Sequence, residues 1–209
     1  MNRDIKYAVS ILLLVLLGVS TFEELQAQEF NAGFFGGVTA SQVDGDLYGG
    51  YHKLGLTGGF FVNRELDMDI FWQMEIKYVS RGAFENFEPI SPGFDKTVFR
   101  YIEIPLSVHY LFKEQVQVEL GISPEVLIHY ASFDGYGQTD PSLYPDNRRF
   151  GLSAFTGIHY WFVPTASVGL RFTYSAISFR EREEWHTAQY RGHFHNVLSL
   201  SMAYKFNHR

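Results

Sequence analysis

One polar segment near the C-terminal end of the chain contains the residue types of a nucleophilic active site. These residues are Ser178, Glu181, Glu183, Glu184, His186 and His193. A serine, a histidine and a carboxylate can together activate a hydroxyl group for attack on a carbonyl carbon. So many polar residues in one segment can produce such a set by chance, however, and no G-x-S-x-G motif accompanies it. We therefore predict no catalytic residues, and hydrolysis of a lipid or a peptide is the alternative.

Histidine is also the residue type that could bind a metal ion, since the sequence has eight histidines and no cysteine. None of the histidines falls in an H-E-x-x-H pattern or a similar spacing. His193 and His195 are two residues apart, which places them on one face of a strand rather than in a metal site. We therefore predict no metal and no cofactor, and the absence of cysteine excludes disulfides.

The elements that position these residues alternate strictly in polarity. From residue 102 to residue 112, the even positions carry Ile102, Ile104, Leu106, Val108, Tyr110 and Phe112. The odd positions carry Tyr101, Glu103, Pro105, Ser107, His109 and Leu111. Successive side chains of a strand point to opposite faces, so this segment has one apolar face and one mostly polar face. Pro105, and Pro124 in the next segment, predict a local bulge or kink, because proline removes a backbone donor.

Eight such segments follow the first 27 residues, and no apolar run approaches the roughly 20 residues of a spanning helix. The segments cover about residues 30–40, 53–62, 70–79, 98–112, 116–130, 150–162, 166–177 and 193–206. Their polar faces are rich in Gly, Ser and Thr, which suits the inside of a narrow barrel. Their other faces are apolar and almost free of charge, as hydrocarbon requires, and lipid cannot satisfy an open sheet edge. We predict an all-β fold: an eight-stranded antiparallel transmembrane β-barrel of outer-membrane type, an up-and-down meander.

The connections alternate between short turns and long loops, which is typical of outer-membrane barrels with their short turns towards the periplasm. The segments that run towards the short turns end in aromatic residues, and aromatic content is 17% of the chain. We expect a periplasmic aromatic girdle, as such barrels have at both interfaces. Its predicted members are Phe60, Tyr110, Phe112, Tyr160, Phe162, Tyr204 and Phe206.

The N-terminal segment is predicted to be separate from this fold. Arg3 and Lys6 precede an apolar run over residues 7–19, and Ala27 offers a small residue for cleavage. This pattern predicts a secretory signal peptide over residues 1–27, followed by one barrel domain over residues 28–209. The formal net charge of −6 argues against nucleic acid as a partner.

Three stretches resemble one family. Residues 34–46, which end in Gln42-Val43-Asp44-Gly45-Asp46, residues 51–55 (Tyr-His-Lys-Leu-Gly) and residues 101–106 (Tyr-Ile-Glu-Ile-Pro-Leu) are similar to the small outer-membrane β-barrels of Bacteroidetes, the PorT-like or "porin family" proteins. The resemblance implies a Gram-negative outer membrane as the location. It also implies contact with membrane lipid and lipopolysaccharide, and a role beside protein partners in an envelope complex such as type IX secretion.

Within such a barrel, the charged residues of the polar faces would meet. The predicted interior network is Glu75, Lys77, Glu103, His109, Glu119, Glu125, Arg171 and Lys205, with His129, His159 and His195 nearby. Charges in a narrow interior require partners, so we interpret these residues as a structural plug; a proton or ion path is the alternative. Eight strands leave an interior that side chains fill, although a small-conductance pore is a further alternative. The loops over residues 82–97 and 132–147 are either protein-recognition surfaces or a lid over the barrel mouth.

Overall fold

A computed structural model describes residues 30–45, 50–86, 94–113, 115–134, 137–139, 147–180 and 192–206. The predicted signal peptide and its cleavage point lie outside these residues. The strands are β1 (Asn31–Asp44), β2 (Lys53–Asp67), β3 (Ile70–Asn86), β4 (Phe94–Glu103), β5 (Leu106–Phe112), β6 (Val116–Asp134), β7 (Gly137–Thr139), β8 (Phe150–Val163), β9 (Ala166–Ser175) and β10 (Phe194–Lys205). No helix among the described residues is long and apolar enough to cross a membrane.

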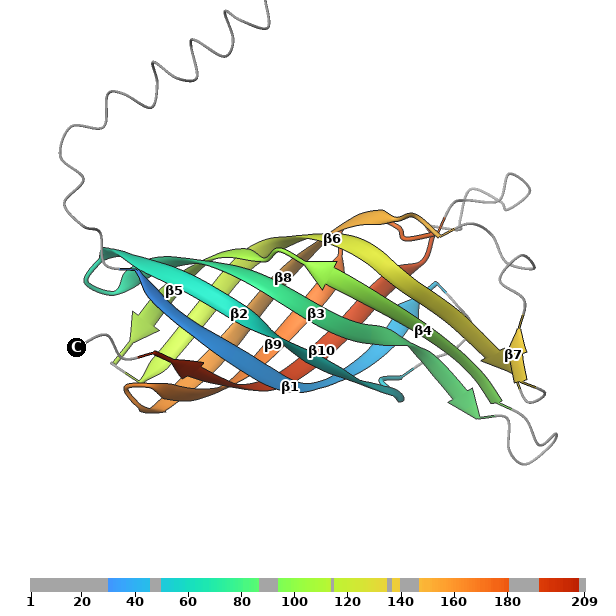
Figure 1. Ribbon diagram of the computed structural model, residues 1–209, viewed down its shortest axis with the longest axis horizontal. Helices are drawn as coiled ribbons and strands as arrows, with labels where there is room; N and C mark the ends of the chain where they lie inside the picture. The colour runs from blue at the N-terminus through green and yellow to red at the C-terminus, as the bar shows by residue number, and fades with distance from the viewer. Residues whose placement is uncertain are drawn as a thin grey trace, which may run out of the picture.

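The strands form a closed barrel, since β1 pairs antiparallel with both β2 and β10 and every other neighbour is also antiparallel (Figure 1). β4 and β5 are successive parts of one barrel strand, since both pair with β3 on one side and with β6 on the other. Pro105 lies at the break between β4 and β5. The ladder continues through this break, because Glu75 N donates to Pro105 O (3.0 Å) and Ile104 N donates to Pro124 O (2.9 Å). β7 only extends the sheet beside β6. The predicted eight-stranded meander is therefore confirmed, and the expected irregularity at Pro105 is this break.

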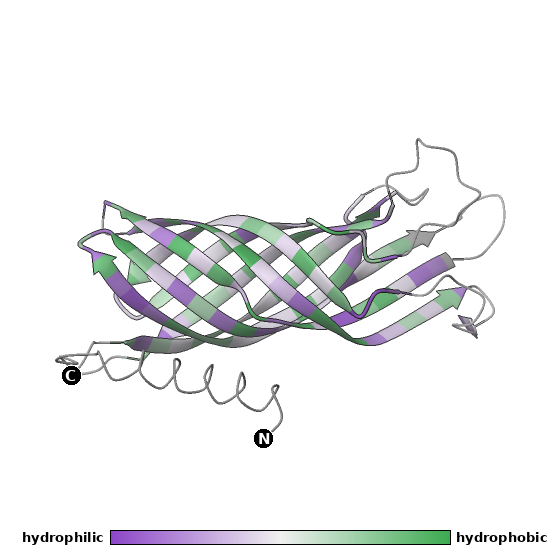
Figure 2. Cartoon of the chain, turned by 90° about the horizontal axis from the view of Figure 1, so that it is seen from above, coloured by the Kyte–Doolittle hydropathy of each residue, from purple (hydrophilic) through white to green (hydrophobic). Residues whose placement is uncertain are grey.

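The apolar faces of the strands point outwards. Leu106, Leu170 and Leu200, three even-numbered residues on different strands, expose 42%, 48% and 52% of their surface. Figure 2 shows hydrophobic and hydrophilic residues alternating along the strands. A wall of exposed aliphatic and aromatic side chains is unfavourable in water, whereas in a bilayer it contacts acyl chains.

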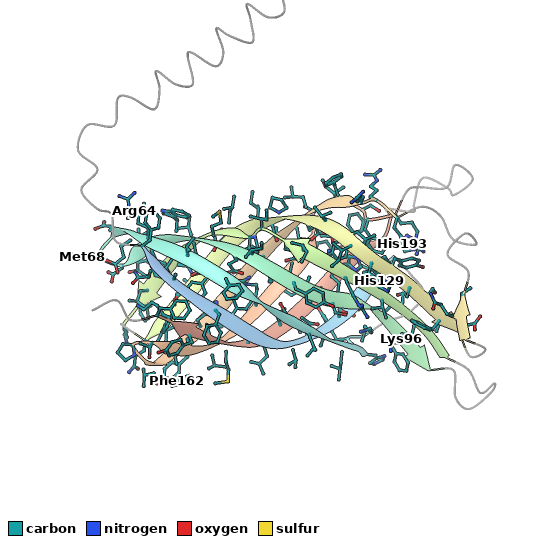
Figure 3. All side chains as sticks on the ribbon, in the orientation of Figure 1. Arg64, Met68, Lys96, His129, Phe162 and His193 are labelled. Atoms are coloured by element: carbon teal, nitrogen blue, oxygen red, sulfur yellow. The ribbon has the colours of Figure 1, made fainter. Side chains whose placement is uncertain are left out.

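The two ends of the barrel differ. One end, here called the short-turn end, carries the turns after β2, β5 and β8, and Arg64, Met68 and Phe162 lie there (Figure 3). The long connections meet at the other end, the long-loop end, where Lys96 and His193 lie (Figure 3). β3 and β6 run further towards the long-loop end than predicted, to Asn86 and Asp134.

A β-bulge in β6 changes the alternation near the long-loop end. Arg100 pairs with His129 and Tyr101 pairs with Leu127, so Ile128 has no partner in β4. Beyond the bulge the parity of β6 is reversed: Tyr130 packs on the core and His129 is exposed on the outer wall. The prediction that His129 lies in the interior is therefore wrong, because an extra residue turns the following side chain to the other face.

Candidate functional site

Two layers of ion pairs fill the interior. The layer nearer the short-turn end, here called the lower layer, is centred on one arginine. Arg171 projects inwards from β9 and donates four hydrogen bonds to two carboxylates. Its Nη atoms reach Glu75 on β3 at 2.6 and 2.9 Å, and its Nε and Nη2 reach Glu119 on β6 at 2.6 and 2.8 Å. All three side chains are buried. Bidentate arginine–carboxylate pairs are strong, charge-assisted contacts, so this layer ties three strands together across the barrel.

The upper layer has the same design with two cations. Arg81 on β3 contacts Glu125 at 2.5 Å and Glu103 at 3.4 Å, and Lys77 contacts Glu103 at 2.6 Å. Serine hydroxyls add to these contacts: Ser123 donates to Glu103 Oε2, which Lys77 also contacts, and Ser153 on β8 donates to Glu125 Oε2. Arg81 was not predicted as an interior residue, because the third segment was expected to end at residue 79.

Two histidines stand beside the lower layer. His159 Nε2 lies 3.3 Å and His109 Nε2 lies 3.7 Å from the Glu119 carboxylate. Ser107 Oγ is 2.7 Å from His109 Nε2, and the Gln117 amide contacts Nδ1. Serine, histidine and glutamate are hydrolase residue types, but here the hydroxyl and the carboxylate face the same ring nitrogen. A catalytic relay needs the carboxylate on the opposite nitrogen, so this arrangement only fills and orders the interior.

Aromatic rings close the interior above the ion pairs. The His195 ring stacks on Phe179 with centroids 4.0 Å apart and lies edge-on to Phe99 at 4.8 Å. Tyr101 Oη lies 3.2 Å from His195 Nε2, and the Arg81 guanidinium lies 4.0 Å from the centre of the Tyr101 ring. Phe179 follows β9 and was not predicted to be inside. The aromatic layer therefore seals the long-loop end of the interior.

The short-turn end is open instead. A cavity of about 400 Å³ lies at this mouth, lined among others by Asn63, Phe71, Gln117, Trp161 and Lys205. Lys205 was predicted to join the carboxylates, but the structure places its ammonium group 5.5 Å from the Trp161 ring. Further inside, the space between Gln117 and Arg171 shrinks to about 30 Å³. The cavity is thus a vestibule that ends at the lower ion-pair layer.

The remaining predicted residues lie outside this interior. The seven residues of the predicted girdle, Phe60, Tyr110, Phe112, Tyr160, Phe162, Tyr204 and Phe206, are all exposed on the outer wall. Of the polar segment with hydrolase residue types, the structure describes Ser178 and His193. Ser178 Oγ accepts a hydrogen bond from His193 N (3.1 Å) and donates to Arg180 O (2.9 Å), so backbone groups engage it. Glu181, Glu183, Glu184 and His186 lie outside the described residues.

Within the described part of the chain, no group of three or more histidine or acidic side chains is arranged to hold a metal ion. The four interior carboxylates instead each contact at least one of three cationic side chains, and two histidines also lie beside Glu119, which shares Arg171 with Glu75. The chemistry that this interior supports is charge pairing, which makes the barrel rigid and closed.

This architecture matches known proteins in two comparisons. A family model described as "Outer membrane protein beta-barrel domain" matches residues 26–180. Among solved structures, Neisserial surface protein A has a TM-score of 0.51 at 13% identity, over 85% of this chain and 97% of that chain. Ail, the attachment invasion locus protein of Yersinia pestis, solved with the heparin analogue sucrose octasulfate, has a TM-score of 0.49 at 14% identity, over 85% and 99%.

OprG from Pseudomonas aeruginosa has a TM-score of 0.37 at 10% identity, over 86% of this chain and 95% of that chain. The comparison with curated proteins gave no match. At such low identities the likeness concerns the fold. The family match spans most of the chain and agrees with the lipid-facing wall and the closed ladder. The chain therefore belongs to the outer membrane protein beta-barrel domain family, and its location is the Gram-negative outer membrane.

Proposed function

We propose that this barrel is a non-catalytic subunit of a larger envelope complex and acts through its outer surfaces. The observation that supports this is the filled interior: in the described part of the chain, two ion-pair layers and an aromatic layer lie across the barrel beyond the vestibule. A barrel without a continuous passage offers its partners loops, turns and wall rather than a path for solutes.

The leading candidate for the complex is type IX protein secretion, and other outer-membrane assembly machinery comes next. The support is the resemblance of residues 34–46, 51–55 and 101–106 to PorT-like barrels of Bacteroidetes. Under this proposal, the short turns face periplasmic components of the machine and the long loops face exported protein or surface partners.

Site-specific cross-linking in cells tests the subunit proposal. A photoreactive residue would replace Met68, which is 92% exposed in the turn between β2 and β3, or Gln138 in β7 at the other end. Leu120, on the lipid-facing wall, is the control for random encounters in the membrane. We expect one defined protein to cross-link at Met68 or Gln138 and to co-purify with a tagged chain in mild detergent. Recovery of the barrel alone at every detergent strength, without a defined cross-link, would contradict the proposal.

Single-channel recording tests the alternative of a small pore. The purified barrel in a planar bilayer should be electrically silent, because an ion would have to displace Arg171 or Arg81 from their carboxylates. A steady, reproducible conductance would show that the interior opens and would favour the pore.

A further inference from the structure

A row of basic side chains crosses the outer wall at the long-loop end. Arg100 lies on β4, His129 lies on β6 beside it, and Arg148 lies just before β8. Arg100 and His129 are directly paired in the ladder, and Leu127 N donates to Arg149 O at 2.8 Å, which holds the start of β8 against β6. All three side chains are exposed. The row thus spans three neighbouring strands.

The bulge in β6 creates this row. With uninterrupted alternation, His129 would point into the barrel, where Tyr130 packs on Phe99 instead. The unpaired Ile128 turns His129 outwards, next to Arg100. Bulges often re-aim a side chain near a functional site, and here the re-aimed group joins two arginines.

The row carries uncompensated positive charge. Within the described ranges, no ion pair or side-chain hydrogen bond engages Arg100, His129 or Arg148, whereas the arginines of the interior are paired at 2.5–3.4 Å. The opposite side of the same rim is different. There Tyr51 Oη donates to Asn196 (2.5 Å) and Asn196 reaches the Asp44 carboxylate (3.4 Å).

Partial burial, together with the Asp44 charge, raises the pKa of the Tyr51 phenol. That side of the rim therefore carries an acidic group, whereas Arg100 and Arg148 lie on the β4–β6–β8 side.

From the row towards the short-turn end, the outward side chains of these strands become apolar. Ile104 and Ile122 are half exposed and Phe150 is 72% exposed, so acyl chains would contact this surface. Exposed cations that border a hydrocarbon-facing wall lie at the height of the lipid headgroups. Since short turns face the periplasm, the long-loop end meets the outer leaflet, whose principal lipid is lipopolysaccharide.

We propose that Arg100, His129 and Arg148 bind the phosphorylated sugar headgroup of one lipopolysaccharide molecule, with its acyl chains on the apolar wall below. Guanidinium groups match phosphate oxygens in a bidentate manner, and an exposed imidazole adds a further donor. Adjacent strands are about 4.8 Å apart, so the backbones that carry the two arginines are about 10 Å apart. This width fits a phosphorylated disaccharide better than the single phosphate of a phospholipid. The site requires no protein partner and so stands apart from the proposed role in a complex.

Lipid binding by the purified full barrel tests the proposal. Native mass spectrometry would titrate the protein with lipid A, with dephosphorylated lipid A and with phosphatidylglycerol. The variant is Arg100→Gln/Arg148→Gln, and the matched control is Arg64→Gln/Lys113→Gln, which removes two charges at the short-turn end, where Arg64 lies (Figure 3). A basic residue near an anionic lipid surface contributes about fivefold in affinity, so the double variant should bind lipid A about 25-fold more weakly.

We expect the control to bind lipid A as the parent does, and the parent to prefer lipid A over both other lipids. Unchanged lipid A affinity in the double variant would overturn the proposal. Equal binding of the dephosphorylated form would overturn the role of phosphate, and equal binding of phosphatidylglycerol would overturn the choice of lipopolysaccharide. If the double variant does not fold, the single variant Arg100→Gln gives the same test with an expected loss of about fivefold.

Discussion

Replacing Arg171 by methionine should destabilise the barrel strongly. Methionine keeps much of the apolar stem but removes all four hydrogen bonds to Glu75 and Glu119. Both carboxylates are buried, so water cannot take the place of the guanidinium. Removal of one partner from a buried ion pair costs about 3–5 kcal/mol, because the other charge is left uncompensated. We expect a loss of that size in the free energy of unfolding.

The measurement is reversible urea unfolding of the barrel in lipid vesicles, followed by tryptophan fluorescence. A triple variant, Arg171→Met with Glu75→Gln and Glu119→Gln, should regain most of the lost stability, since neutral amides can bond to one another without a buried charge. Arg64→Met at the short-turn end is the control and should change stability by about 0.5 kcal/mol or less. The reasoning would be refuted if Arg171→Met lost less than about 1 kcal/mol, or if the triple variant were no more stable than the single one.

Three further changes test other parts of the structure. Gly37→Ala should cost about 2 kcal/mol, because its Cβ would lie 2.1 Å from a backbone carbonyl oxygen of β10, whereas Gly36→Ala has open space and should be neutral in the same urea assay. Tyr101→Phe removes the hydroxyl that contacts His195 and should cost about 1 kcal/mol; no change in the unfolding midpoint would mean that the contact contributes nothing. Ser178→Ala should leave any lipid or peptide hydrolysis by the purified barrel unchanged, and a loss of hydrolysis with intact folding would favour the enzyme.

The fold could be predicted from the sequence because a membrane barrel repeats one local rule. Every strand must place apolar residues at alternate positions, so Leu106, Leu170 and Leu200 could be assigned to the outer wall without knowledge of their neighbours. The same rule placed Glu75, Glu119 and Arg171 on the inner faces, and the structure brings these three side chains together. Which carboxylate each cation meets depends on strand register and tilt, and no single segment contains that information.

Two residues show where the local rule stops. Arg81 continues the odd-numbered inner face of Lys77 and Val79, but the sequence predicts a strand end at residue 79 and therefore a loop at Arg81. Strands that extend past the apolar band lack the outward apolar residues by which a strand was recognised. His129 is the opposite case. The alternation of apolar and polar residues around His129 is regular in the sequence. The bulge that turns His129 outwards exists only as a mismatch in the pairing of β4 with β6. Single-strand patterns cannot reveal a feature that belongs to a pair.

The unequal ends of the interior restrict what the barrel can contact. From the short-turn end, a small molecule could enter the vestibule of about 400 Å³ and would stop at Gln117 and the Arg171 layer. From the long-loop end, the stacked rings of Phe179 and His195 bar entry above Arg81. Exchange across the membrane would require both layers to open together, and each is held by buried ion pairs or close-packed rings. The two ends of the interior are therefore closed by different means: ion pairs lie behind the vestibule, and stacked aromatic rings lie across the long-loop end.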